Sequence, residues 1–380
     1  MIVVAFAIAL LLPLGFLYLV RIQDLYGQGQ FKHVILSFVW GLAAFGLAYA
    51  ANSFAVDAMG NTRAAATTLR TTVAPIVEEI LKSLILIALA RRMTYFVDGA
   101  IYGFAAGIAF SILENILYLL DARAGSAGGQ MLARSLSTCL MHGSASALVG
   151  IAIGRFRYGH GASRLLSALL GWAAAIGLHM AFNRLVNAGP SAGAVIGTLG
   201  LGLGGVGLII LFIRWGLAEE KRWIGETLGA GSGVTRGEVA VVRRYDQIDD
   251  LLEPIVERFG EEKAEQVEEF LLKQAHLGIK RKAQTMSQDP GEKKDLAKQI
   301  AALHDEMEAI RKQVGVYCMT YVRTIFPEDA VACWTMLEQR LSEQGLRAWG
   351  GPSLQASLTG RAERKRSAGD MWDRLGKVGE

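Results

Sequence analysis

Seven apolar stretches of about 20 residues fill most of the first 217 residues of this 380-residue chain. A helix needs about that length to cross the hydrocarbon core of a bilayer, and only helices and closed barrels satisfy their backbone hydrogen bonds there. The sequence therefore predicts an all-α, polytopic membrane helix bundle. To within a few residues, the expected spans are 1–20, 33–56, 72–91, 97–120, 132–154, 164–187 and 192–215.

The charged residues divide the chain into two parts. Residues 1–217 hold only 14 of the 39 Lys and Arg and 7 of the 35 Asp and Glu. We therefore expect a transmembrane domain at 1–217, a Gly-containing linker at 218–240 and a soluble helical domain at 241–380. In this last part an apolar stripe runs from Ile248 to Phe259, and a second amphipathic run covers 293–325.

The basic excess of the chain does not indicate a nucleic-acid partner. It belongs to the membrane part, where Lys and Arg flank spans, so the expected environment is a lipid bilayer. The spacing of the three cysteines, Cys139, Cys318 and Cys333, fits neither a zinc module nor a disulfide framework. We expect all three to be reduced and to serve in packing. The first span lacks a basic n-region and a clear cleavage site, so we expect it to be retained.

Short loops carry the orientation signal. Those after the first, third and fifth spans hold Lys and Arg, whereas the opposite loops hold fewer, among them Arg63, Arg70 and Arg123. The excess predicts that the N-terminus lies outside and the C-terminal domain in the cytoplasm. In the last span, "GLGLGGVG" from Gly200 matches a nucleotide-loop pattern, but that loop requires a βαβ unit. Close helix packing through small residues explains these glycines better.

Five acidic and histidine side chains lie deep inside the spans, where ionisable groups are costly and indicate function by default. They are Glu78, Glu79, Glu114, His142 and His179. Counting from the span ends places the two histidines, Glu79 and Glu114 about 10 to 15 Å below one surface. We therefore expect four helices to deliver carboxylates and imidazoles to one layer, on the non-cytoplasmic half.

Residues four apart share a helix face, which adds polar neighbours to this layer. Asn183 follows His179, Tyr118 follows Glu114, and Lys82 follows Glu78 at that spacing. A like-charged pair such as Glu78 and Glu79 requires a partner in low dielectric, and Lys82 can serve one of the two.

The sequence lacks the catalytic residues of several other classes of membrane protease. No HExxH run exists, no aspartate lies deep, and a serine dyad of Ser144 or Ser146 with His179 would leave three buried glutamates without a task. Two mechanisms remain open. A glutamate takes a proton from water while His and Asn stabilise the oxyanion, or two histidines and a glutamate hold Zn²⁺ and another glutamate acts as base.

The same residues resemble a known family. "EEILK" (Glu78, Glu79, Lys82), "FSILENILY" (Glu114, Asn115, Tyr118), His142 and "HMAFN" (His179, Asn183) look like the ordered motifs of the PrsW family of intramembrane proteases. That family is related to the CAAX-processing and bacteriocin-processing membrane endopeptidases. The resemblance covers residues 72–187.

The resemblance implies a protease of the bacterial plasma membrane that cuts a membrane-anchored protein or peptide, in some members an anti-sigma factor during stress signalling. By similarity to the CAAX-type relatives, Glu78 would activate water and Glu79 would support it. His142, His179 and Asn183 would position the water and stabilise the oxyanion. Glu114 stands where those relatives have His, and Lys82 replaces an arginine at a shorter spacing. The metal question therefore stays open, with Glu114, His142 and His179 as candidate ligands.

Two other classes of function use the same residues. A proton-coupled transporter or channel would use the Glu and His groups as a relay; broken helices or inverted repeats would favour it, and Pro75 is the only candidate break. A non-catalytic scaffold that presents the soluble helices would tolerate neutral replacement of the buried carboxylates. The expectation remains a membrane-embedded protease.

Overall fold

The computed structural model describes residues 2–27, 30–121, 129–155, 157–158, 161–189, 191–229 and 234–326. Throughout these ranges the secondary structure is helical, without a strand, which confirms the all-α class. Arg123, Cys333 and the part of the expected soluble domain beyond residue 326 lie outside them. The chain divides into two compact units, Met1–Thr320 and Tyr321–Glu380. Most of the second unit is not described.

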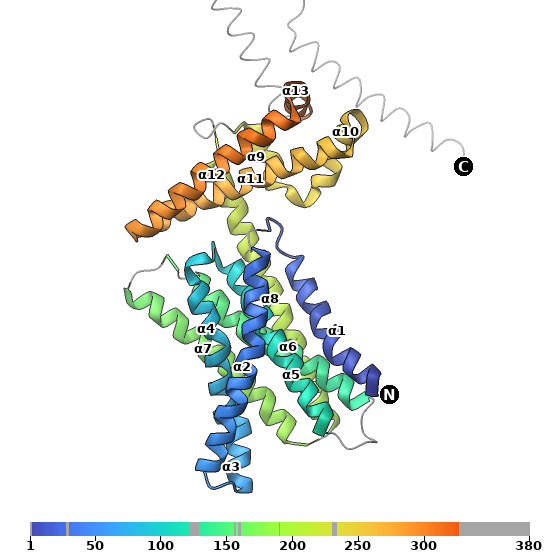
Figure 1. Ribbon diagram of the computed structural model, residues 1–380, viewed down its shortest axis with the longest axis vertical. Coiled ribbons are helices and arrows are strands. Elements are labelled where there is room, and N and C mark those ends of the chain that lie inside the picture. Colours follow the sequence, from blue (N-terminus) through green and yellow to red (C-terminus); the bar gives the residue numbers. More distant parts are fainter. Residues whose placement is uncertain are drawn as a thin grey trace, which may run out of the picture. The chain divides into compact units, whose positions relative to one another are not determined.

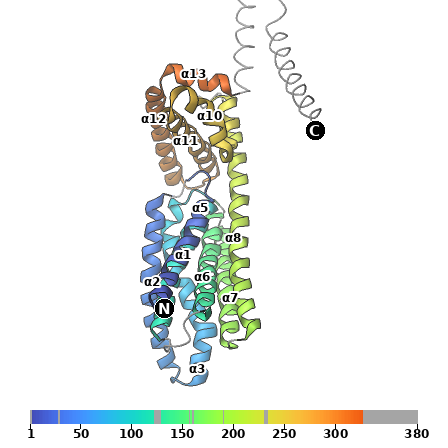
Figure 2. The same cartoon turned by 90° about the vertical axis from the view of Figure 1, so that its right-hand side faces the viewer.

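Seven helices run side by side as a bundle (Figures 1 and 2). They are α1 (Ile2–Arg21), α2 (Phe31–Ala58), α4 (Ala74–Leu89), α5 (Phe96–Asp121), α6 (Gly129–Arg155), α7 (Gly161–Asn187) and α8 (Ala192–Thr227). Five of them, α2, α5, α6, α7 and α8, are long and apolar enough to cross a membrane. The protein is therefore a multi-span membrane protein, but seven spans are not confirmed.

The other two helices of the bundle, α1 and α4, are not among these five. The described side chains of α1 begin at Phe6, which leaves a shorter apolar helix, Phe6–Arg21. Helix α4 has only 16 residues, but it continues a helical run that starts with α3 (Arg63–Thr68). The expected helices thus lie where the sequence placed them, and five of them meet the length and hydropathy of a complete crossing.

Helices α5 and α6 form the centre of the bundle. Glycines 99, 103 and 107 of α5 face the backbone of Gly150, Ser146 and His142, so closely that a Cβ at any of the three would overlap a carbonyl oxygen. Such small-residue contacts let membrane helices approach each other. The approach brings the helices of Glu114 and His142 together.

A π-helical turn, Leu69–Val73, precedes α4. At its end the N–H of Ala74 bonds to the carbonyl of Leu69, five residues back, and the next residue, Pro75, has no N–H to donate. Pro75 is thus accommodated by a wide turn rather than a break. The carbonyl of Arg70 consequently lacks a backbone donor, and the Asn183 Nδ2 of α7 donates to it at 2.8 Å.

Helix α8 contains the glycine-rich run in its interior. A Cβ at Gly202 or Gly205 would meet α6 at Ser137, Leu140 or Ser144, whereas Gly200 and Gly204 face open space. The packing interpretation is therefore confirmed for two glycines, and no nucleotide loop forms. The helix ends only at Thr227, so residues 218–227 of the expected linker are helical.

The remaining described helices are α9 (Arg236–Arg243), α10 (Ile248–Phe259), α11 (Glu261–Met286), α12 (Pro290–Val314) and α13 (Val316–Ile325). The expected apolar stripe buries Ile248, Leu252 and Ile255 of α10. Helix α11 pairs with α12, and its His276 donates from Nε2 to the carbonyl of Tyr26 at 2.7 Å.

We expect Gly107→Ala to lower the stability of the purified protein by about 1 to 3 kcal/mol, because the added methyl group overpacks the contact with the His142 carbonyl. Thermal unfolding in detergent measures the change. Gly177→Ala is the matched control, since a Cβ there meets nothing within 4 Å and alanine favours helix. Equal melting temperatures for both variants would contradict the close α5–α6 contact.

Burial lowers the pKa of His276 to about 4 from the usual 6.5. The unfolded chain therefore binds a proton at this site below pH 6.5, whereas the folded chain does so only near pH 4. Stability contributed by the neutral ring is present above pH 6.5 and is lost as the pH falls to about 4, by at most about 1.4 kcal/mol per pH unit. His276→Gln should flatten the melting temperature between pH 7 and 4.5. His304→Gln, on α12, is the control, and an unchanged profile in His276→Gln would refute this origin.

Candidate functional site

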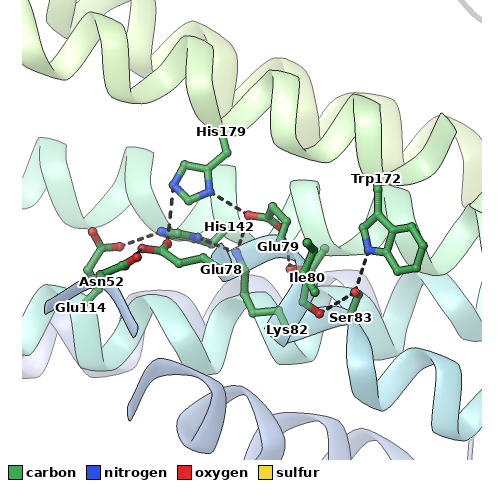
Figure 3. A network of polar contacts seen from close by, with 11 residues as sticks. Asn52, Glu78, Glu79, Ile80, Lys82, Ser83, Glu114, His142, Trp172 and His179 are labelled. Atoms are coloured by element: carbon green, nitrogen blue, oxygen red, sulfur yellow. Dashed lines mark hydrogen bonds and ion pairs between the residues drawn. The ribbon is translucent and has the colours of Figure 1, made fainter. Parts of the chain in front are cut away.

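Helix α4 carries three charged side chains toward its neighbours α2, α6 and α7 (Figure 3). Two tryptophans, from α2 and α7, hold this helix by hydrogen bonds. Trp40 Nε1 of α2 donates to the carbonyl of Leu81 at 2.9 Å, and Trp172 Nε1 of α7 donates to Ser83 Oγ at 2.7 Å. The rotation of α4, and with it the direction of Glu78, Glu79 and Lys82, is thereby fixed.

Glu79 and Lys82 form a fully buried ion pair. Both side chains are 0% exposed, and Lys82 Nζ lies 2.6 Å from Glu79 Oε1. The same ammonium lies 2.8 Å from His142 Nδ1 and 4.8 Å from the ring centre of Phe110. A buried charge needs such a partner, because neither solvent nor any other charge would compensate it if the partner were removed.

His179 sits between the two adjacent carboxylates of α4. Its Nδ1 is 2.8 Å from Glu79 Oε1 and its Nε2 is 3.7 Å from Glu78 Oε2. A carboxylate at Nδ1 keeps the proton on that nitrogen, so the lone pair of the neutral ring is on Nε2. His179 therefore presents an electron pair toward Glu78.

His142 of α6 links the ion pair to a third carboxylate. Its Nε2 is 2.7 Å from Glu114 Oε2 of α5, and its ring centre is 4.7 Å from that of His179. Nε2 must carry a proton to donate to Glu114, and it must lack one to bind a metal ion. These two uses of the atom exclude each other.

One group of donors can hold a metal ion in the described part of the chain. Glu78, His142 and His179 each offer an atom, and the three atoms lie within 4.8 Å of one another. Two imidazoles and one carboxylate are the ligand set of several catalytic zinc sites. The three carboxylates of the cluster also outnumber its single ammonium, and a divalent cation would offset that excess. The residues therefore fit a metal ion.

The structure brings together five of the six residues expected to be catalytic, Glu78, Glu79, Glu114, His142 and His179, with Lys82 among them. Lys82 pairs with Glu79, which the sequence had left open between the two glutamates. The structure differs from the expectation in one detail: Glu78 rather than Glu114 completes the group of possible metal ligands with the histidines. Asn183 is half-buried and bonds to the Arg70 carbonyl instead of a member of the cluster. Tyr118 is 42% exposed, and Asn115 is buried.

Two contacts of the cluster had not been expected. Asn52 Nδ2 of α2 donates to Glu78 Oε1 at 3.1 Å, and Ser146 Oγ of α6 approaches Glu79 Oε2 at 3.4 Å. An asparagine within an apolar span is a signal that could have identified Asn52. Ser146 thus contacts a carboxylate, and Ser144 packs toward Gly205 of α8, so neither supports a serine dyad with His179.

Comparison with known proteins gives one match. The family model described as PrsW family intramembrane metalloprotease matches residues 29–215. This segment runs from the start of α2 into α8 and includes every member of the cluster. Neither a curated protein nor a solved structure matches the chain significantly.

We expect Lys82→Met to destabilise the protein by about 3 to 5 kcal/mol, because Glu79 then remains buried as an uncompensated charge. The double variant Lys82→Met, Glu79→Gln should recover part of the loss, since it removes both charges. Thermal unfolding in detergent measures each variant. A double variant less stable than Lys82→Met alone would show that the ion pair is not the main interaction of either side chain.

Proposed function

Because this chain belongs, through residues 29–215, to the PrsW family of intramembrane metalloproteases, we propose that Glu78, His142 and His179 form its hydrolytic centre. The protein is a membrane-embedded protease. The observation that carries the proposal is the convergence of these three donors. One of them, His179, has its other ring nitrogen held by Glu79. That arrangement orients a metal ligand.

Glu78, His142 and His179 would hold the ion, and Zn²⁺ is the ion that suits two imidazoles and a carboxylate. When bound, Zn²⁺ supplies a Lewis acid that polarises a peptide carbonyl and makes a water molecule more acidic. Because the ligands come from α4, α6 and α7, the centre forms only when these helices are packed together.

The other charged residues act on these ligands and on protons. Glu79 fixes the tautomer of His179, and Lys82 compensates Glu79 within the hydrocarbon. Glu114, whose side chain is 22% exposed, is the carboxylate outside the ligand group. It would accept a proton from the attacking water and return it to the leaving amine, as a general base and then acid.

The substrate class follows from the location of the centre among spanning helices. We propose membrane-anchored proteins, of which a membrane-bound anti-sigma factor cut during stress signalling is the example that the resemblance suggests. The resemblance suggests the bacterial plasma membrane. The distribution of Lys and Arg supports an N-terminus outside and α9–α13 in the cytoplasm.

A proton-coupled transporter is the alternative that uses the same side chains. Transporters of this kind carry interrupted helices at the binding site. The π turn before Pro75 keeps α3 and α4 in one helical run, and Trp40 and Trp172 hold α4. These contacts favour a fixed centre over a moving relay.

Cleavage in cells tests the proposal. Candidate single-span membrane proteins are produced together with wild type, Glu78→Gln, His179→Ala or Glu114→Gln at equal membrane abundance, and released fragments are quantified by immunoblot. We expect at least about a 100-fold loss in the first two variants, which lack a ligand, and a loss of about 10²- to 10⁴-fold in Glu114→Gln, which lacks the base.

Asp57→Asn is the control, because Asp57 is an exposed carboxylate at the end of α2, outside the cluster. It should cleave like wild type. Equal fragments from wild type and all the cluster variants would refute the proposed centre, and proton flux into vesicles would then be the assay for the transporter alternative.

A further inference from the structure

Asn52 is a polar residue on α2, a helix whose exposed side chains are mostly apolar. Around it on α2, Tyr49 is 57% exposed and Phe54 is 77% exposed, as expected for a helix that faces lipid. Asn52 itself is half-buried, and its Nδ2 donates to Glu78 Oε1 at 3.1 Å. An amide within a span needs a partner, and here the partner is a carboxylate of the proposed centre.

This contact gives the two oxygens of Glu78 different surroundings. Oε1 receives the hydrogen bond from Asn52, whereas Oε2 lies 3.7 Å from His179 Nε2. A carboxylate can otherwise rotate about its last bond and exchange these oxygens. With Oε1 held by the amide, Oε2 is directed at the space that His142 and His179 share.

We propose that Asn52 is a positioning residue, which holds Glu78 so that one oxygen points at the metal centre formed with His142 and His179. The inference rests on the proposed function, in which Glu78 is a ligand. Hydrogen-bond partners of metal ligands contribute to metal affinity, and their loss typically weakens it about 10- to 100-fold. Asn52 would be such a partner, supplied by a helix outside the four that carry the cluster.

Helix packing alone does not account for this amide. Trp40 already joins α2 to α4 through the Leu81 carbonyl. Among the described residues, the Oδ1 of Asn52 is buried and has no hydrogen-bond partner. An amide that satisfies only one of its two polar atoms contributes little to helix packing, and its one partner is Glu78. Function rather than stability then explains the residue.

Zinc affinity of the full chain, purified in detergent, tests the proposal without a substrate. Competition with a chromogenic chelator gives the dissociation constant for Zn²⁺, and thermal unfolding of the metal-free protein gives its stability. We expect Asn52→Leu to weaken Zn²⁺ binding about 10- to 100-fold, a larger loss than the change in the melting temperature of the metal-free protein accounts for. Asn52→Gln keeps an N–H donor and should recover part of the affinity.

Two serines on the same helix serve as controls. Ser37 is buried with its Oγ unpartnered among the described residues, and Ser53 is exposed and donates to the Tyr49 carbonyl. Neither touches Glu78, so Ser37→Ala and Ser53→Ala should bind Zn²⁺ like wild type.

The outcomes separate this inference from the proposed function. If Glu78→Gln weakens Zn²⁺ binding but Asn52→Leu binds like wild type, Asn52 does not position Glu78 and the inference is wrong. It is also wrong if Asn52→Leu loses affinity only in proportion to a lower melting temperature. If wild type does not bind Zn²⁺, or Glu78→Gln binds it unchanged, the zinc centre itself is refuted and the inference falls with it.

Discussion

A carboxylate buried among spanning helices needs a compensating charge, and the cluster depends on Lys82 providing it for Glu79. Each member of this ion pair also touches a histidine: Lys82 reaches His142 Nδ1, and Glu79 reaches His179 Nδ1. One buried pair on a single helical turn therefore orients both imidazoles, which come from two other helices. The two histidines are arranged by the interaction that makes the charges tolerable in the membrane, so stability and geometry cannot be separated at this site.

Backbone contacts decide whether those helices can reach one another. The glycines of α5 let α6 approach until carbonyl oxygens fill the space of a Cβ. The π turn before α4 contains one residue more than an α-helical turn. The extra residue turns the side chains of α4 by about 100° about the helix axis, relative to an uninterrupted α-helix. Pro75 and Asn183 act together at this turn. The proline has no N–H to donate, and the side chain of Asn183 donates to the Arg70 carbonyl instead. The residue four positions after His179 thus supports the helix of Glu78 and Glu79.

The sequence predicted the composition of the cluster because deep charged residues are rare in spans, and counting along each helix placed them at one depth. It could not predict which carboxylate pairs with Lys82, since Glu78 and Glu79 are both within reach of it on a helix. It also could not predict that Glu78 rather than Glu114 joins the histidines, because that depends on how α4 is rotated. Asn52 was missed because only ionisable residues were counted inside the spans, and an asparagine is polar but not ionisable. Counting apolar residues also could not predict that α4 itself has 16 residues and continues a helical run that begins with α3.

His142 connects the two open descriptions of the chemistry through a single atom. While Nε2 carries a proton, it donates to Glu114, and the cluster is a hydrogen-bonded network of carboxylates and imidazoles. If Nε2 held an ion instead, the ring proton would have to be on Nδ1, the nitrogen that lies 2.8 Å from Lys82 Nζ. That tautomer would place two donors against each other unless Lys82 gave up a proton. Glu114 would no longer accept from the imidazole and could accept a proton from water. Metal binding would therefore change the partners of both Lys82 and Glu114 through this one ring.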